Sequence, residues 1–111
     1  MKGSIFENFI ITEFLKENFN RGEIFELYFW RDNHQKEIDL IVNLGAKQYG
    51  LEIKSTKTIQ EKHFSSLNYW LKLTKGKEEE IFLIYSGQEN YLRNKINVVS
   101  WNNIAKKIID I

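Results

Sequence analysis

The spacing of hydrophobic residues changes along the chain, and each spacing predicts a different element. In residues 4–18 the apolar positions recur at helical intervals, and Ser4 is a natural N-cap, so we predict an amphipathic helix. Residues 23–30 are rich in aromatic side chains, which is typical of a strand. Residues 59–73 return to helical spacing and predict a second amphipathic helix that ends at the sequence Thr-Lys-Gly.

Two segments between these helices alternate and predict a hairpin of two strands. In residues 37–44 the alternation predicts that one face carries Ile38, Leu40, Val42 and Leu44, and the other Glu37, Asp39, Ile41 and Asn43. In residues 47–54 it expects a buried face of Tyr49, Leu51 and Ile53, with Glu52 and Lys54 opposite. A short apolar run at 81–85 predicts a buried strand, 96–99 another strand, and 101–109 a closing helix.

The predicted order is αβββαβ followed by βα, which defines an α/β fold. A length of 111 residues suits one domain, residues 1–111, and an apolar fraction of 42% supports a packed core. The chain has no cysteine and only two histidines, so any metal would be held mainly by oxygen ligands. We therefore expect a hard cation, Mg²⁺ or Mn²⁺, if a metal binds.

Charge is spread unevenly although the net charge is only +1. Residues 47–77 hold seven lysines against two acidic residues, a local charge of +5, which could attract a phosphate backbone or could be an ordinary solvated helix face. The chain shows neither the apolar core of a signal peptide nor an apolar run of about 20 residues, so we expect a cytoplasmic protein without a membrane partner.

The predicted hairpin brings chemically reactive groups together. A turn centred on Gly45 and Ala46 places Asp39 directly opposite Glu52, and two carboxylates so placed repel each other unless a cation, a proton or a lysine compensates. These carboxylates, with the carbonyl of Ile53, predict a site for Mg²⁺ or Mn²⁺. Lys54, two residues after Glu52, would stabilise charge on a phosphate or position an attacking water.

Four segments resemble the PD-(D/E)XK nuclease superfamily, and within it the nuclease-like domain of unknown function found C-terminal to prokaryotic AAA-type ATPases. They are residues 3–9 (GSIFENF), 28–31 (YFWR), 37–40 (EIDL) and 51–55 (LEIKS). The resemblance covers nearly the whole chain and implies a three-layer, restriction-endonuclease-like αβββαβ core with a mixed central sheet and a closing C-terminal βα. An ATPase of that family would carry a GxxxxGK[ST] loop, which is missing here, so the chain would be either one domain of a longer ATPase-containing protein or a stand-alone relative.

The same resemblance implies roles for individual residues. Asp39 and Glu52 would be metal ligands, Lys54 the catalytic lysine, and Glu7 an accessory carboxylate, in a metal-dependent hydrolysis of DNA phosphodiester bonds. Ile38 stands where the proline of the superfamily name would be, a mild departure that leaves the strand intact. Archaeal Holliday-junction resolvases are similar in their helix-borne glutamate and E-x-K strand, which suggests branched or duplex DNA by analogy only.

Several readings stay open on the sequence. Glu7 completes an S-x-x-E pattern with Ser4 and could serve only as a capping box. Ser55, Lys57 and Lys62 could hold nucleic-acid phosphates, DNA or RNA, or could simply begin a helix. The chain could also be a catalytically silent nucleic-acid-binding or assembly module, or a homodimer that pairs through the aromatic segment 28–30.

Overall fold

The computed structural model describes residues 4–111, so Met1–Gly3, including the Gly3 of the first family-like segment, lie outside it. Its strands form one six-stranded sheet in the order β1-β2-β3-β4-β6-β5. The bounds of the strands are β1 Glu26–Arg31, β2 Glu37–Leu44, β3 Lys47–Lys54, β4 Ile81–Tyr85, β5 Tyr91–Arg93 and β6 Ile96–Ser100. The β3–β4 and β4–β6 pairs are parallel and the others antiparallel, so the sheet is mixed, as expected.

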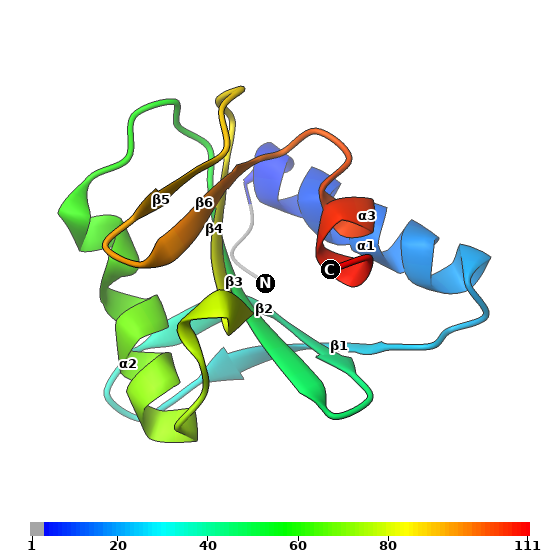
Figure 1. The fold of residues 1–111 in the computed structure, drawn as a ribbon, viewed down its shortest axis with the longest axis horizontal. Coiled ribbons are helices and arrows are strands. Elements are labelled where there is room, and N and C mark those ends of the chain that lie inside the picture. Colours follow the sequence, from blue (N-terminus) through cyan, green and yellow to red (C-terminus); the bar gives the residue numbers. More distant parts are fainter. Residues whose placement is uncertain (1–3) are drawn as a thin grey trace.

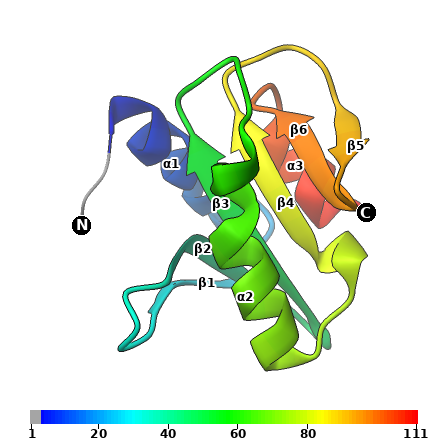
Figure 2. The same cartoon turned by 90° about the vertical axis from the view of Figure 1, so that its left-hand side faces the viewer.

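Helices cover both faces of this sheet and make three layers. The helices α1 (Ile5–Asn20) and α3 (Ile104–Ile109) lie side by side on one face, and α2 (Ser65–Thr74) lies on the other (Figures 1 and 2). Two hydrophobic cores result, one under α1 and α3 around Phe14 and Leu51, and one under α2 around Trp70 and Leu83. The predicted three-layer α/β architecture with a mixed sheet is therefore confirmed.

Local sequence explains how α1 begins and how closely α2 packs on the sheet. Ser4 caps α1 as predicted, because its hydroxyl accepts a hydrogen bond from the Glu7 amide at 3.0 Å. Trp70 packs directly over Gly50 of β3, where a Cβ atom would come within 2.8 Å of the indole ring. Glycine at this position therefore lets α2 approach the sheet closely next to Glu52 and Lys54.

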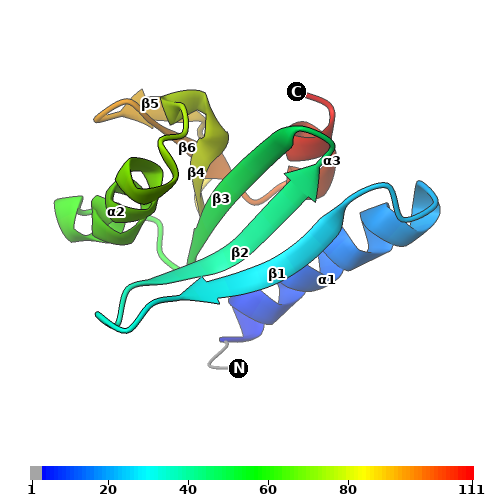
Figure 3. The same ribbon diagram turned by 90° about the horizontal axis from the view of Figure 1, so that it is seen from below.

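The hairpin β2–β3 matches the predicted bounds and register. The two strands lie side by side (Figure 3), and their residue partners run from Leu44 opposite Lys47 to Leu40 opposite Leu51. Tyr49, Leu51 and Ile53 all lie in the core under α1 and α3, as the alternation of β3 predicted. Turn geometry and side-chain period were thus sufficient to place these two strands.

The predicted face of Ile38 was wrong. Tyr28 pairs with Ile41 but Trp30 pairs with Ile38, so two β2 residues oppose the single residue Phe29 in a β-bulge. The extra residue reverses the alternation, and Ile38 enters the core under α2 while Leu40 and Val42 stay under α1. Asp39 is one of the two bulged residues.

Other boundaries also differ from the predictions. Strand β1 begins at Glu26 rather than at residue 23, because the chain first turns with Asn18 bonded to the backbone of Phe25. The second predicted helix divides into a 3₁₀ turn, η1 (Glu61–Phe64), and α2, since His63 Nδ1 accepts a hydrogen bond from the Gln60 amide and tightens the entry. The three-residue strand β5 was missed altogether.

Candidate carboxylate site at the fork of strands β2 and β3

The hairpin opens into a fork at the end opposite its turn. Backbone pairing between the two strands stops at Leu40 and Leu51, although β2 extends back to Glu37 and β3 extends on to Lys54. Beyond that point β2 continues beside β1, and β3 continues beside β4, where Lys54 lies opposite Tyr85. The first pair of residues inside the fork is Asp39 and Glu52.

Each carboxylate in the fork accepts a backbone amide of the facing strand. Asp39 Oδ2 accepts a hydrogen bond from the Ile53 amide at 2.8 Å, and Glu52 Oε1 accepts one from the Asp39 amide at 3.3 Å. These side-chain bonds take the place of the backbone ladder that the fork interrupts. The two acidic residues therefore lie close together in the fork, each with its carboxylate bonded to a backbone amide of the facing strand, although the regular strand pairing ends at Leu40 and Leu51.

Burial makes this pair electrostatically unfavourable when both groups are charged. Glu52 is only 5% exposed, and burial followed by the charge of Asp39 raises its pKa to about 8. Burial likewise raises the pKa of Asp39, although the hydrogen bond from the Ile53 amide and the charge of Lys54 oppose this. Near neutral pH the Asp39 and Glu52 pair therefore retains a proton or favours the binding of a cation.

Lys54 is the positive group closest to the buried glutamate. Its Nζ lies 3.6 Å from Glu52 Oε2, and its side chain is 37% exposed, so the ammonium lies at the boundary between the fork and solvent. Its charge lowers the pKa of Glu52, but less than burial and Asp39 raise it. Lys54 therefore compensates part of the carboxylate charge while remaining accessible from outside.

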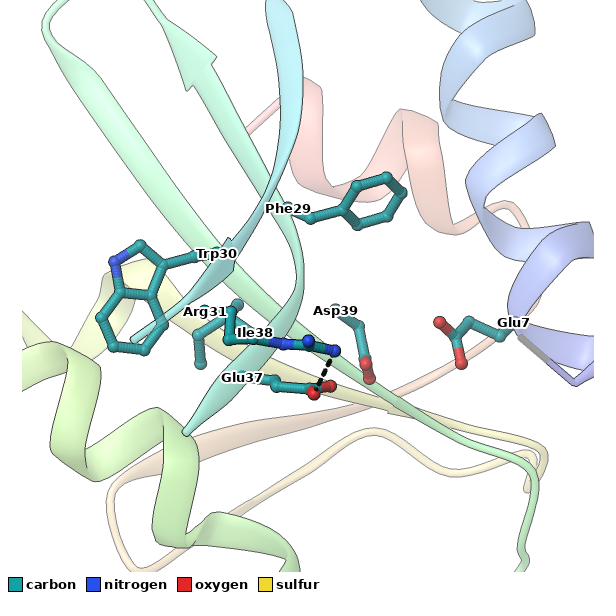
Figure 4. A pocket seen from close by; sticks show the side chains of 7 residues that line it. All are labelled: Glu7, Phe29, Trp30, Arg31, Glu37, Ile38 and Asp39. Atoms are coloured by element: carbon teal, nitrogen blue, oxygen red, sulfur yellow. Dashed lines mark ion pairs between the residues drawn. The ribbon is translucent and has the colours of Figure 1, made fainter. Parts of the chain in front are cut away.

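Glu7 approaches the same region from α1. Figure 4 shows the Glu7 carboxylate extending from α1 toward Asp39, and both residues line one cavity. This cavity, of about 260 Å³, is lined by Glu7, Phe29, Trp30, Arg31, Glu37, Ile38 and Asp39. Burial and then the Asp39 charge raise the pKa of Glu7, while Lys54 lowers it, so Glu7 lies within the field of the fork.

The structure contains only part of the capping box that was predicted for Ser4 and Glu7. The Glu7 amide donates to the Ser4 hydroxyl, but the hydrogen bonds among residues 4–111 include none from the Ser4 amide to the Glu7 carboxylate. One half of the capping box is present, and it uses the backbone of Glu7. The side chain is left facing the cavity.

The groups available to a divalent cation are the oxygens of Asp39 and Glu52, with the Ile53 carbonyl beside them. Two hard oxygen donors under mutual repulsion fit Mg²⁺ or Mn²⁺ by ligand chemistry, and a cation would relieve the raised pKa values. Within residues 4–111, however, no three acidic or histidine side chains converge closely enough to form a ready-made cage. Substrate oxygens or waters would have to complete such a site.

The remaining predicted site residues do not all lie together. Ser55 and Lys57 line a groove beside the fork, whereas Lys62 lies on η1. His34 lies exposed in the turn after β1.

Sequence reasoning missed two features of this site. Arg31 and Glu37 form an ion pair at 2.7 Å beside the cavity, which their pairing across β1 and β2 explains. The pKa of His63 is lowered by burial and by Lys54, Lys62 and Arg93, so the far side of the fork is basic. Arg93 is distant from His63 in the sequence, so only the fold brings these two residues near one another.

Fold and site together define a three-layer α/β protein with a carboxylate pair and a lysine at a strand fork. The chain belongs to the family described as Domain of unknown function (DUF4143), whose profile matches residues 2–104. No curated protein matches the chain. Among residues 4–111 there is also no helix with the length and apolar character needed to cross a membrane.

Proposed function

We propose that this chain hydrolyses phosphodiester bonds of DNA in a metal-dependent reaction, at a PD-(D/E)XK-type site formed by Glu7, Asp39, Glu52 and Lys54. One observation carries the proposal. In the β2–β3 fork the buried Glu52 carboxylate, with a pKa of about 8, lies 3.6 Å from the Lys54 ammonium and accepts a hydrogen bond from the backbone amide of Asp39, whose own charge raises that pKa. Strongly perturbed ionisable groups that gather beside a cavity are typical of functional sites.

Asp39 and Glu52 would hold the Mg²⁺ or Mn²⁺ ion, with Ile53 supplying its carbonyl. When bound, such an ion polarises a phosphate oxygen and makes a water molecule more acidic. The protein's own contribution is orientation, because the Ile53 and Asp39 amides hold one oxygen of each carboxylate in place. The other oxygen of each group is thereby directed away from the facing backbone amide.

Lys54 and Glu7 would act on the phosphate and on the proton. The half-exposed Lys54 ammonium can donate to a non-bridging phosphate oxygen and stabilise the charge that develops there during in-line attack. Glu7, whose raised pKa reflects burial and the Asp39 charge, can accept a proton at its carboxylate from the attacking water. Ser55, Lys57 and Lys62 would bind flanking phosphates.

A cleavage assay tests the proposal. Plasmid, single-stranded and four-way DNA are incubated with the chain and Mg²⁺ or Mn²⁺, and the wild type is compared with Asp39→Asn and Lys54→Gln. Asparagine retains an oxygen that can accept from the Ile53 amide, so the fork can fold while its charge is lost. We expect each variant to lose at least about a hundredfold in rate.

Glu26→Gln is the matched control, because Glu26 is an exposed carboxylate on the neighbouring strand β1 and takes no part in the fork. It should cleave like the wild type. Equal cleavage by the wild type, Asp39→Asn and Lys54→Gln would mean that the activity comes from elsewhere and would refute the nuclease proposal.

A second function is favoured by one observation: both carboxylates are already engaged by backbone amides, and three acidic or histidine groups do not converge within residues 4–111. The chain would then be a catalytically silent nucleic-acid-binding or assembly module, acting as a homodimer or beside an AAA-type ATPase domain. Binding of DNA with no cleavage in any metal, and no change of melting temperature with Mn²⁺, would favour this function.

A further inference from the structure

A second hollow, larger than the cavity at Glu7, lies next to the fork. This groove, of about 650 Å³, is lined by Ile5, Phe6, Phe9, Ser55, Lys57, Ser86, Gln88 and Trp101. Three of these residues directly follow strands that run in the same direction, namely Ser55 after β3, Ser86 after β4 and Trp101 after β6. The first turns of α1 form the opposite wall.

The α1 wall of the groove is apolar and open to solvent. Ile5 is 91% exposed and Phe9 is 44% exposed, which is unusual for large apolar side chains in neighbouring turns of one helix. Phe9 also contacts Trp101 edge to face, with ring centroids 5.9 Å apart and an interplanar angle of 68°. The two rings therefore form a preassembled aromatic platform.

The polar wall of the groove is rich in hydrogen-bond donors. Ser55 and Ser86 present hydroxyl groups, and Lys57 adds an ammonium. The carbonyl oxygen of Gln88 already accepts from the Asn102 amide group at 2.9 Å, so Gln88 has its own NH₂ group left to offer. No carboxylate is among the lining residues. A complementary ligand would be negatively charged, rich in acceptors and flat.

The groove and the carboxylate fork are linked by two pairs of residues that are adjacent in the chain. Phe6 in the groove precedes Glu7 at the cavity, and Ser55 in the groove follows Lys54 in the fork. A polymer with a phosphate at Lys54 would therefore reach the aromatic platform within its next few units.

We propose that this groove binds unpaired bases of a DNA strand whose backbone passes the fork, with Phe9 and Trp101 as the stacking surface and Lys57 on a phosphate. The inference rests on the proposed function and narrows its substrate to DNA with a single-stranded segment beside the cleaved bond. Paired bases in a duplex hide their faces, whereas unpaired bases stack on aromatic side chains. A peptide would bring neither the regular negative charge nor the flat acceptor-rich rings that this wall complements.

Binding measured without cleavage tests the groove separately from the chemistry. Fluorescence anisotropy of a labelled oligothymidylate and of a duplex of equal length is recorded in EDTA. We expect Phe9→Ala to weaken single-strand binding about tenfold and to leave duplex binding unchanged. Lys57→Gln should lower the slope of log affinity against log salt by roughly 0.7 for the single strand.

Phe19→Ala is the matched control, because Phe19 is also an exposed phenylalanine on α1, 75% exposed, and is not among the residues that line the groove. It should bind both probes like the wild type. Phe9 is far enough into solvent for its removal to leave the fold intact, and circular dichroism of each variant checks this.

Unchanged single-strand binding in Phe9→Ala and Lys57→Gln would overturn the groove proposal even if the wild type cleaves DNA. Weakened single-strand binding without any cleavage would support the groove and refute the nuclease. If Phe9→Ala dissociates a dimer in sedimentation but binds DNA normally, the groove is an interface between copies of the chain and the proposal is wrong.

Discussion

The two ends of the β2–β3 hairpin each carry a cross-strand polar pair, and the two pairs behave in opposite ways. Near the turn Asn43 lies opposite Gln48, and Gln48 Nε2 donates to Asn43 Oδ1 at 3.0 Å and to the Tyr28 hydroxyl at 2.6 Å. At the fork the same register brings Asp39 and Glu52 together, and neither can donate to the other when ionised. The two amide side chains form a hydrogen bond with each other, whereas the two carboxylates accept hydrogen bonds from backbone amides.

This difference shows how one hairpin separates a structural end from a reactive end. Amide side chains are donors and acceptors at once, so a partly exposed amide pair needs nothing else. Carboxylates only accept, and burial of Glu52 beside Asp39 raises its pKa to about 8. The fork therefore stores electrostatic repulsion that protons, Lys54 or a cation can relieve.

The largest predicted effect is on stability at high pH. Because the folded-state pKa of Glu52 lies above its ordinary value of 4.5, folding favours its protonated form, and this stabilisation is lost as pH rises toward and through about 8. Glu52→Gln should be more stable than the wild type at pH 9 by roughly 2–4 kcal/mol, with little difference near pH 4.5. Urea unfolding at pH 4.5, 7 and 9 measures this. If the free energy of unfolding changed with pH equally in the two proteins, the Glu52 carboxylate would not be electrostatically strained in the fork.

The next effect is stabilisation by a metal ion. Millimolar Mn²⁺ should raise the melting temperature of the wild type by about 5 °C at pH 8, because a cation bound to the folded state offsets the repulsion between Asp39 and Glu52. The rise should shrink at pH 6, where protons compete for Glu52. Asp39→Asn should abolish it, and Asn43→Ala, a change at the turn end, should keep it; a rise that survives in Asp39→Asn would place the ion elsewhere.

A smaller effect should follow if the turn end is made to imitate the fork. The double variant Asn43→Asp with Gln48→Glu removes the hydrogen bond between the two side-chain amides. It places two carboxylates opposite each other at a partly exposed position, where water screens their charges. We expect a loss of about 1–2 kcal/mol at pH 8 that is partly recovered at acid pH. Chemical unfolding of the double and single variants tests this, and a loss as large as the strain at the fork would mean that burial is not the main cause there.

The smallest effect should come from Tyr28→Phe. It removes only the acceptor of one exposed Gln48 hydrogen bond and should cost about 0.5 kcal/mol at every pH. Thermal melting at pH 5 and pH 8 should give the same small decrease. A decrease that depended on pH would link the two ends of the hairpin electrostatically.

Much of the fold was predictable because it depends on short-range rules. Alternation and a turn at Gly45 were enough for the bounds of β2 and β3 and for their register as far as Leu40 opposite Leu51, beyond which Asp39 and Glu52 come together. A hydroxyl before a helical pattern was enough for the Ser4 cap. The bulge opposite Phe29, the short strand β5 and the 3₁₀ entry to α2 left no such periodic signal, and they were missed.

The candidate site was likewise predictable only where it depends on local sequence. Residue types and spacing in the chain were sufficient to group Asp39, Glu52 and Lys54, since hairpin register and side-chain alternation are local, whereas Glu7 on the first helix was added only by the family resemblance. The opening of the strands into a fork, the burial of Glu52 and the approach of α1 depend on how layers far apart in sequence pack against one another. Electrostatic strain follows from that burial, so it belongs to the folded molecule alone.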